Sequence, residues 1–242
     1  PQLEIYTSME ATAKQGEYIR DGLDYNLWMS NIHRVLTDSN VKKLHMMMTI
    51  NSLCLNSITE FMDEMLDLRE TYGERAPTMT LNILRFPSFQ AAAILPEDIK
   101  TFYKEKLDNW YQSSRPQEMM SDGEKESVRR LVDYLDIVKT PHKNTAETPK
   151  LYNDFKSFFA QYDIRRDKDF VSTFPGPLAD WFTSLEAEVP SRNQILLGDN
   201  AVKTFTQVMV DPATIEEYDG GDDEHEVDLI AGWNTDTDSL GG

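Results

Sequence analysis

The sequence predicts an α/β protein built around a parallel sheet. Three segments with the apolar character of strands recur at intervals of roughly forty residues, and a helical pattern follows each of them. The connections between these segments are long enough for right-handed helical crossovers, which join parallel strands. The pattern is typical of half of an α/β barrel or of an open doubly wound sheet.

The three strands are predicted at residues 3–7, 43–51 and 78–84. The second, "KLHMMMTIN", is continuous and apolar enough for a strand that is buried on both faces. The third, "TMTLNIL", alternates apolar and polar positions. The first begins at the start of the chain, where an apolar strand is expected to need a neighbour on each side. Because Pro1 is not preceded by methionine, we expect further βα units upstream of this sequence.

Between the first two strands, apolar residues at helical spacing predict one helix of about five turns. Between the second and third strands, Ser57 and Glu60 have the spacing of a capping box, which predicts a helix beginning there. The stripe of the first helix consists of Leu23, Trp28, Ile32, Val35 and Leu36.

The rest of the chain is predicted to be mainly helical. A helix follows Pro96, and a second capping box, Ser121 with Glu124, begins another. An aromatic-rich helix spans residues 151–162, and "PGPLADWF" predicts a turn into a short final helix. We therefore divide the chain into the end of a barrel (residues 1–95), a helical extension (96–187) and an acidic, flexible tail (188–242).

Composition and charge exclude several classes of function. The net charge is −18, and residues 204–242 hold acidic side chains but no Lys or Arg, so a general basic field for nucleic acid is not expected. No apolar run is long enough to span a membrane, and the predicted compartment is the cytoplasm. Cys54 is the sole cysteine, which excludes an internal disulfide and a multi-cysteine metal site within these residues.

Polar side chains stand at the end of each predicted strand. Ser8 and Glu10 follow the first strand, Thr49 and Asn51 end the second, and Asn82 lies near the end of the third. Ligands of parallel α/β proteins bind at the carboxyl ends of the strands, so these side chains are candidates for one small-molecule site. The alternative is that strand ends are polar because they reach the surface.

Four stretches, in this order, resemble the later portion of radical S-adenosylmethionine (SAM) proteins, most closely those of large tailed phages and related metagenomes. They are "IYTSMEA…EYIRDGLDYNLWMSNIHRVL", "MMMTINSLCLNSITEFMDEML", "TLNILRFPSFQAAAILP" and "FFAQYDIRRDKDFVSTFP". The resemblance covers roughly residues 2–185. It implies a partial parallel (β/α) barrel, of which this chain holds the last three βα units.

The resemblance also implies cofactors. Proteins of this superfamily hold a [4Fe–4S] cluster through three thiolates of a C-x-x-x-C-x-x-C loop, and SAM bound to the cluster yields a 5′-deoxyadenosyl radical that abstracts hydrogen. This sequence lacks that motif, and Cys54 alone does not replace three ligands. The cluster is therefore expected only with a segment upstream of Pro1.

Site residues follow from the resemblance position by position. Ser8 and Glu10 match residues that contact the SAM ribose, and Arg20 matches an arginine near the SAM carboxylate, for which its forked donors are suited. Thr49 and Asn51 match a Thr-x-Asn near SAM, and Asn82 joins them as a polar strand-end residue. The alternative for Arg20 is a helix-surface ion pair with Asp24, four residues on.

The sequence thus favours a fragment of a radical SAM enzyme that contributes SAM and substrate contacts. Its expected partners are SAM, an unknown substrate such as a peptide or protein, and a reductant protein, in the host cytoplasm if a phage encodes it. Neither a membrane nor nucleic acid in general is expected. The alternative is a non-catalytic binding or virion-associated protein that keeps the barrel remnant as a scaffold.

Overall fold

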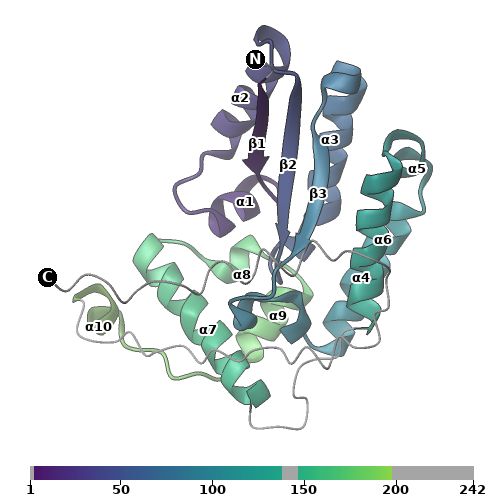
Figure 1. Cartoon of the computed structure of the whole chain (residues 1–242). Coiled ribbons are helices and arrows are strands. Elements are labelled where there is room, and N and C mark those ends of the chain that lie inside the picture. Colours follow the sequence, from purple (N-terminus) through teal and green to yellow (C-terminus); the bar gives the residue numbers. More distant parts are fainter. Residues whose placement is uncertain (1–2, 138–146, 198–242) are drawn as a thin grey trace, which may run out of the picture. The chain divides into compact units, whose positions relative to one another are not determined.

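A computed structural model describes residues 3–137 and 147–197, all within one compact unit. Strands β1 (Glu4–Ser8), β2 (Lys43–Ile50) and β3 (Thr78–Ile83) pair in parallel in the order β1-β2-β3 (Figure 1). The predicted α/β class, the parallel pairing and the three strand positions are confirmed.

The two faces of this sheet differ. Along β2 buried positions alternate with partly exposed ones, so the prediction of a strand buried on both faces is wrong. The reason is that the helices pack against one face, where the indole Nε1 of Trp28 donates to Thr7 Oγ1 at 3.0 Å. The covered face buries Leu44, Met46, Met48, Ile50, Met79 and Leu81. The opposite side, which we name the open face, carries Tyr6, Ser8, His45, Met47, Thr49, Thr78, Thr80 and Asn82, each partly or fully exposed.

Two helices, not one, connect β1 to β2. Helix α1 spans Ala13–Ile19 and helix α2 spans Tyr25–Asp38. The chain turns between them at Gly22, whose φ of +81° suits glycine, and the Asp24 side chain caps α2 by accepting from the Leu27 N–H. The predicted helix is confirmed as α2, although its 14 residues make it shorter than five turns. The prediction of one helix in this connection is wrong, because α1 precedes α2 and the turn at Gly22 separates the two.

Helix α3 (Ile58–Tyr72) joins β2 to β3, but the capping box predicted at its start does not form. The Ser57 hydroxyl accepts from the backbone N–H of Thr12, and the Glu60 carboxylate pairs with Lys106. Residues from distant parts of the chain therefore bind both side chains, and neither is left to cap α3. Short 3-10 turns lie at Cys54–Asn56, Gly73–Arg75, Ser88–Gln90 and Ala92–Ile94.

Helices α4 (Glu97–Tyr111), α5 (Ser114–Met119) and α6 (Asp122–Ile137) follow β3. The capping box of Ser121 and Glu124 is confirmed: the Glu124 carboxylate accepts from the Ser121 N–H at 2.8 Å, and the Ser121 hydroxyl accepts from the Glu124 N–H at 3.4 Å.

An aromatic cluster forms the core of the C-terminal helices, α7 (Glu147–Arg166), α8 (Phe170–Thr173), α9 (Pro177–Ser184) and α10 (Arg192–Leu197). The aromatic helix and the "PGPLADWF" helix are confirmed, but α9 is not the last helix because α10 follows it. Helix α10 lies inside the predicted tail, and residues 198–242 of that tail lie outside the described residues. The aromatic cluster of the C-terminal helices includes Phe155, Phe159, Phe170, Phe174, Trp181 and Phe182.

Within the described ranges, no helix has the length and apolar character needed to cross a bilayer.

Candidate functional site

The carboxyl ends of the three strands lie at one edge of the sheet. Ser8 pairs in register with Met47, and Thr49 with Asn82. Beyond Ser8, the Met9 N–H donates to the Met47 carbonyl at 3.3 Å, which continues the parallel ladder past the end of β1. The structure thus brings the predicted site residues Ser8, Thr49 and Asn82 onto one face, with the segment that carries Glu10 beside them.

Glu10 and Arg20 form an ion pair at this edge. The Arg20 Nη2 donates to Glu10 Oε2 at 2.5 Å, and the side chains are 2% exposed for Glu10 and 31% for Arg20. Burial raises the pKa of Glu10, although the Arg20 guanidinium and a backbone hydrogen bond from Thr49 oppose that shift. Arg20 therefore does not pair with Asp24, which caps α2 instead. A buried carboxylate beside a half-exposed guanidinium can bind hydroxyl groups and an anion side by side.

Ser8, Thr49 and Asn82 have side chains that reach solvent on the open face. Asn82 was predicted as a polar residue near the end of the third strand. The structure explains its position: β3 alternates, so Asn82 shares the exposed side with Thr80. A hydroxyl and an amide in register are available there to a ligand.

Asn51 is occupied by its own loop. Its side-chain oxygen accepts from the N–H groups of Leu53 and Cys54, at 2.9 and 3.0 Å, and its amide donates to the Thr49 carbonyl at 3.1 Å. This is the local turn chemistry that Asn favours after a strand. The polar atoms of Asn51 are therefore not available to a ligand beside the other predicted residues. Instead, the Asn51 side chain shapes the loop that follows β2.

Three buried side-chain atoms that follow the ends of β1 and β2 have no hydrogen-bond partner among the residues that the structure describes. They are Arg20 Nε, Gln15 Oε1 and Ser52 Oγ. Because buried polar atoms are nearly always paired, such atoms mark places where water or a ligand completes the bonding. Sequence reasoning missed Gln15, and the available signal was its place shortly after a strand end. The Gln15 amide also donates to Asn56 Oδ1 at 2.7 Å, which ties α1 to the loop after β2.

The residues of this chain do not fit an iron–sulfur cluster. The thiol of Cys54, the sole cysteine, is fully buried and donates to the Asn51 carbonyl at 3.2 Å. Burial raises the pKa of this thiol, so the thiolate that binds iron is disfavoured. Over residues 3–137 and 147–197, no group of three or more His, Cys, Asp or Glu side chains is arranged to hold a metal ion.

His45 lies on the open face, nearer the amino ends of the strands. Its ring stacks on Tyr6 with centroids 4.4 Å apart, and its Nδ1 lies 3.0 Å from Thr78 Oγ1. Neighbours on both adjacent strands therefore hold this histidine in place.

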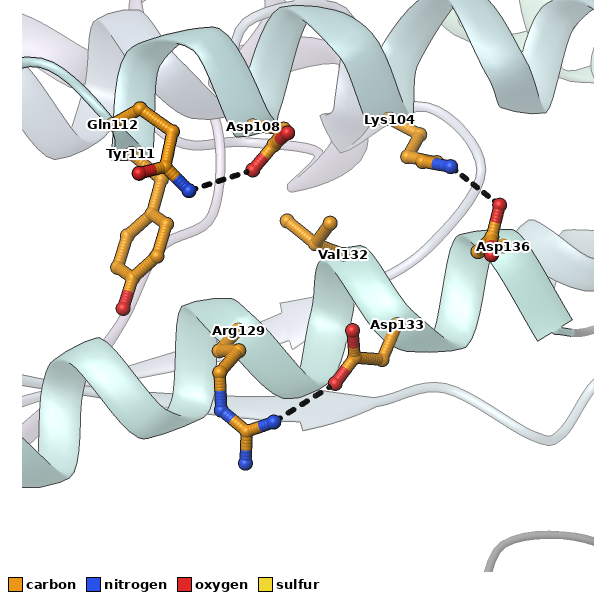
Figure 2. Close-up of a pocket in the computed structure, with 8 residues that line it drawn as sticks. All are labelled: Lys104, Asp108, Tyr111, Gln112, Arg129, Val132, Asp133 and Asp136. Atoms are coloured by element: carbon orange, nitrogen blue, oxygen red, sulfur yellow. Dashed lines mark hydrogen bonds and ion pairs between the residues drawn. The ribbon is translucent and has the colours of Figure 1, made fainter.

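A separate pocket of about 320 Å³ lies between α4 and α6 (Figure 2). Its charged groups pair with one another: Lys104 with Asp136 across the two helices, and Arg129 with Asp133 along α6 at 3.2 Å. None of the predicted site residues lines it. The remaining carboxylate, Asp108, accepts from the Gln112 amide at 3.3 Å. We interpret the pocket as the solvated groove between two packed helices, because both of its cations already pair with carboxylates.

Comparison with models of protein families, with curated proteins and with solved structures found no match.

Proposed function

We propose that this chain is part of a radical SAM enzyme and supplies contacts to SAM at the carboxyl ends of β1–β3. The observation that carries the proposal is the ion pair of Glu10 and Arg20 at the carboxyl ends of the strands, in which the Arg20 Nε has no hydrogen-bond partner within residues 3–137 and 147–197. The parallel β1-β2-β3 order, with a crossover between successive strands, also supports the last three βα units of a partial barrel.

Each residue has a role that suits its chemistry. The Glu10 carboxylate would accept hydrogen bonds from the ribose hydroxyls, and the Arg20 guanidinium would pair with the SAM carboxylate. Ser8, Thr49 and Asn82 would offer hydroxyl and amide groups along the open face. SAM, when bound and reduced by one electron from a reductant protein through the cluster, would supply the 5′-deoxyadenosyl group for hydrogen abstraction from an unknown substrate. The cluster that this chemistry requires would take its thiolates from outside this sequence, because Cys54 is the only cysteine here.

The alternation of buried apolar and exposed polar side chains along the strands is a further argument for a polar ligand. The covered face is apolar apart from Thr7, whose hydroxyl Trp28 binds, whereas the open face carries hydroxyl, amide and imidazole groups in the same three strands. A permanent helical layer over those groups would bury them without partners, which is costly. A small polar molecule with many hydrogen-bonding atoms suits such a surface better.

The test is SAM binding to the 242-residue chain by isothermal titration calorimetry, with adenosine and methionine as separate ligands. We expect saturable SAM binding that Glu10→Gln weakens about tenfold, the effect of losing a hydrogen bond to a charged group. Glu126→Gln, at an exposed ion pair on α6, is the matched control and should bind like the wild type. Unchanged affinity in a folded Glu10→Gln protein, or no binding by the wild type, would overturn the proposal.

A second candidate is a non-catalytic binding protein with the same scaffold, and the buried state of Cys54, the sole cysteine, favours it. The two candidates differ in the residues encoded upstream of Pro1. A C-x-x-x-C-x-x-C motif there supports the enzyme, and anaerobic reconstitution of the longer protein should then convert SAM into 5′-deoxyadenosine. An initiator methionine directly before Pro1 supports the binding protein.

A further inference from the structure

The last turn of α1, which leads directly to Arg20, is held by the end of α7. The final four carbonyl groups of a helix have no partner within it. Two of those in α1 accept from residues far along the chain: the Glu17 carbonyl from Lys168 Nζ at 2.6 Å, and the Tyr18 carbonyl from the Tyr162 hydroxyl at 2.8 Å.

Side chains of the same turn are held as well. Tyr18 is 2% exposed, and its hydroxyl donates to Asp163 Oδ1 at 2.7 Å. Asp21, directly after Arg20, pairs with Arg166 Nη1 at 3.0 Å and with Lys168 Nζ at 3.1 Å. Residues on both sides of Arg20 are therefore bound to this part of α7 and the turn after it, while Arg20 itself reaches Glu10.

Helix α1 has only seven residues, and a helix of that length is not stable by itself. Its end therefore depends on tertiary contacts for its position. We propose that residues 162–168 are a positioning element for Arg20, which fixes the guanidinium beside Glu10 by holding residues 17–21. The helical extension is then an integral part of the ligand site. The inference rests on the proposed function only for the identity of the ligand.

The first test is local hydrogen exchange by NMR. The amides of Arg20 and Leu23 donate to the carbonyls of Gly16 and Arg20, at 2.9 and 3.1 Å, and so report on this segment directly. Lys168→Met, which keeps the length of the stem and removes the ammonium, should speed their exchange roughly threefold to tenfold. Lys168→Arg keeps a cation and should restore much of the protection.

Lys104→Met is the matched control. It also removes a lysine that pairs with an aspartate, but this ion pair joins α4 to α6, away from α1. Lys104→Met should leave the amides of Arg20 and Leu23 unchanged. If Lys168→Met does not fold, Tyr162→Phe serves instead, because it deletes only the hydroxyl that donates to the Tyr18 carbonyl.

The second test is the affinity for SAM. Lys168→Met should weaken binding roughly threefold to tenfold, and it should have no further effect when Arg20→Met is already present. A purely structural role would add the same loss in both backgrounds.

Three results would overturn the inference: unchanged exchange of the two amides in Lys168→Met, equal acceleration in Lys104→Met, or acceleration spread evenly over β2 and β3. If wild-type protein does not bind SAM, the proposed function fails, but the exchange measurement still decides the positioning role.

Discussion

The guanidinium of Arg69 and the carboxylate of Glu124 form a two-bond pair, with Nη1 to Oε2 at 2.9 Å and Nη2 to Oε1 at 2.7 Å. The same Glu124 Oε1 accepts the backbone N–H of Met79 at 2.8 Å. A side chain from α6 thus binds one donor on the outer edge of β3, which would otherwise be free to pair with another strand. Glu124 therefore caps a helix, pairs with an arginine of α3 and binds the backbone of the edge strand.

We predict that Glu124→Gln lowers the free energy of unfolding by about 3–5 kcal/mol, the usual effect of leaving one partner of a buried pair uncompensated. Arg69 is the residue left without its anion, and it is mostly buried. Urea unfolding monitored by circular dichroism measures the effect, with Glu126→Gln in the exposed turn of α6 as the control. A Glu124→Gln protein as stable as this control would contradict the prediction.

Acid should weaken the same pair. Burial alone would raise the pKa of Glu124, but the hydrogen bonds from Arg69, Met79 and Ser121 outweigh it and lower the pKa below the ordinary value of 4.5. The stabilisation is therefore present above pH 4.5 and is lost as the pH falls from there through the lower folded value. The free energy of unfolding should fall more steeply below pH 4.5 in the wild type than in Glu124→Gln.

Glu10 should give the opposite pH dependence. Burial raises the pKa of Glu10 above 4.5 despite the Arg20 charge. The contribution of the protonated Glu10 to the free energy of unfolding is therefore fully present below pH 4.5, and it is lost as the pH rises through the pKa of Glu10 in the folded protein. Arg20→Met removes the opposing charge, so it should cost about 2 kcal/mol at pH 7 and less at pH 4.5, because the raised pKa of Glu10 favours its neutral form as the pH falls. Unfolding at both pH values measures this, and an equal cost at both would refute it.

Two glycines in helices should respond to alanine with opposite signs. A Cβ on Gly16 in α1 would lie 2.8 Å from the Ala11 carbonyl oxygen and 3.1 Å from Met9 Sδ, so the backbone before α1 would have to move. Gly123 in α6 has nothing within 4 Å of such an atom. We expect Gly16→Ala to destabilise the protein and Gly123→Ala to stabilise it by about 0.5–1 kcal/mol, as thermal unfolding would show.

The spacing of apolar and polar residues predicted those helices and strands that depend only on neighbouring residues. The three strands, the aromatic helix and the Ser121 capping box depend on spacing within a few residues, and each is confirmed. The capping box of Ser57 and Glu60 has the same spacing but fails, because Thr12 and Lys106 bind the two side chains instead. Nothing in the spacing distinguishes the two cases, since those partners come from distant segments.

The candidate site shows the same division. Glu10, Thr49 and Asn82 were predicted from their place at strand ends, and Arg20 from the resemblance alone. All four lie at or beside the carboxyl ends of the strands. The pairing of Glu10 with Arg20 was not predicted, because Asp24 stands at a better helical spacing. Asn51 matched the pattern equally well, yet its polar atoms bind the backbone around it.

By itself, the order of apolar and polar residues determined the three strands, their parallel pairing and most of the helices, although it missed α1 and α10. Only the tertiary structure decided which charges meet: Arg20 with Glu10, Arg69 with Glu124, and Lys168 with the end of α1. The physical reason is that periodicity acts along neighbouring residues, whereas a buried charge takes whichever partner the packed chain places within hydrogen-bond distance.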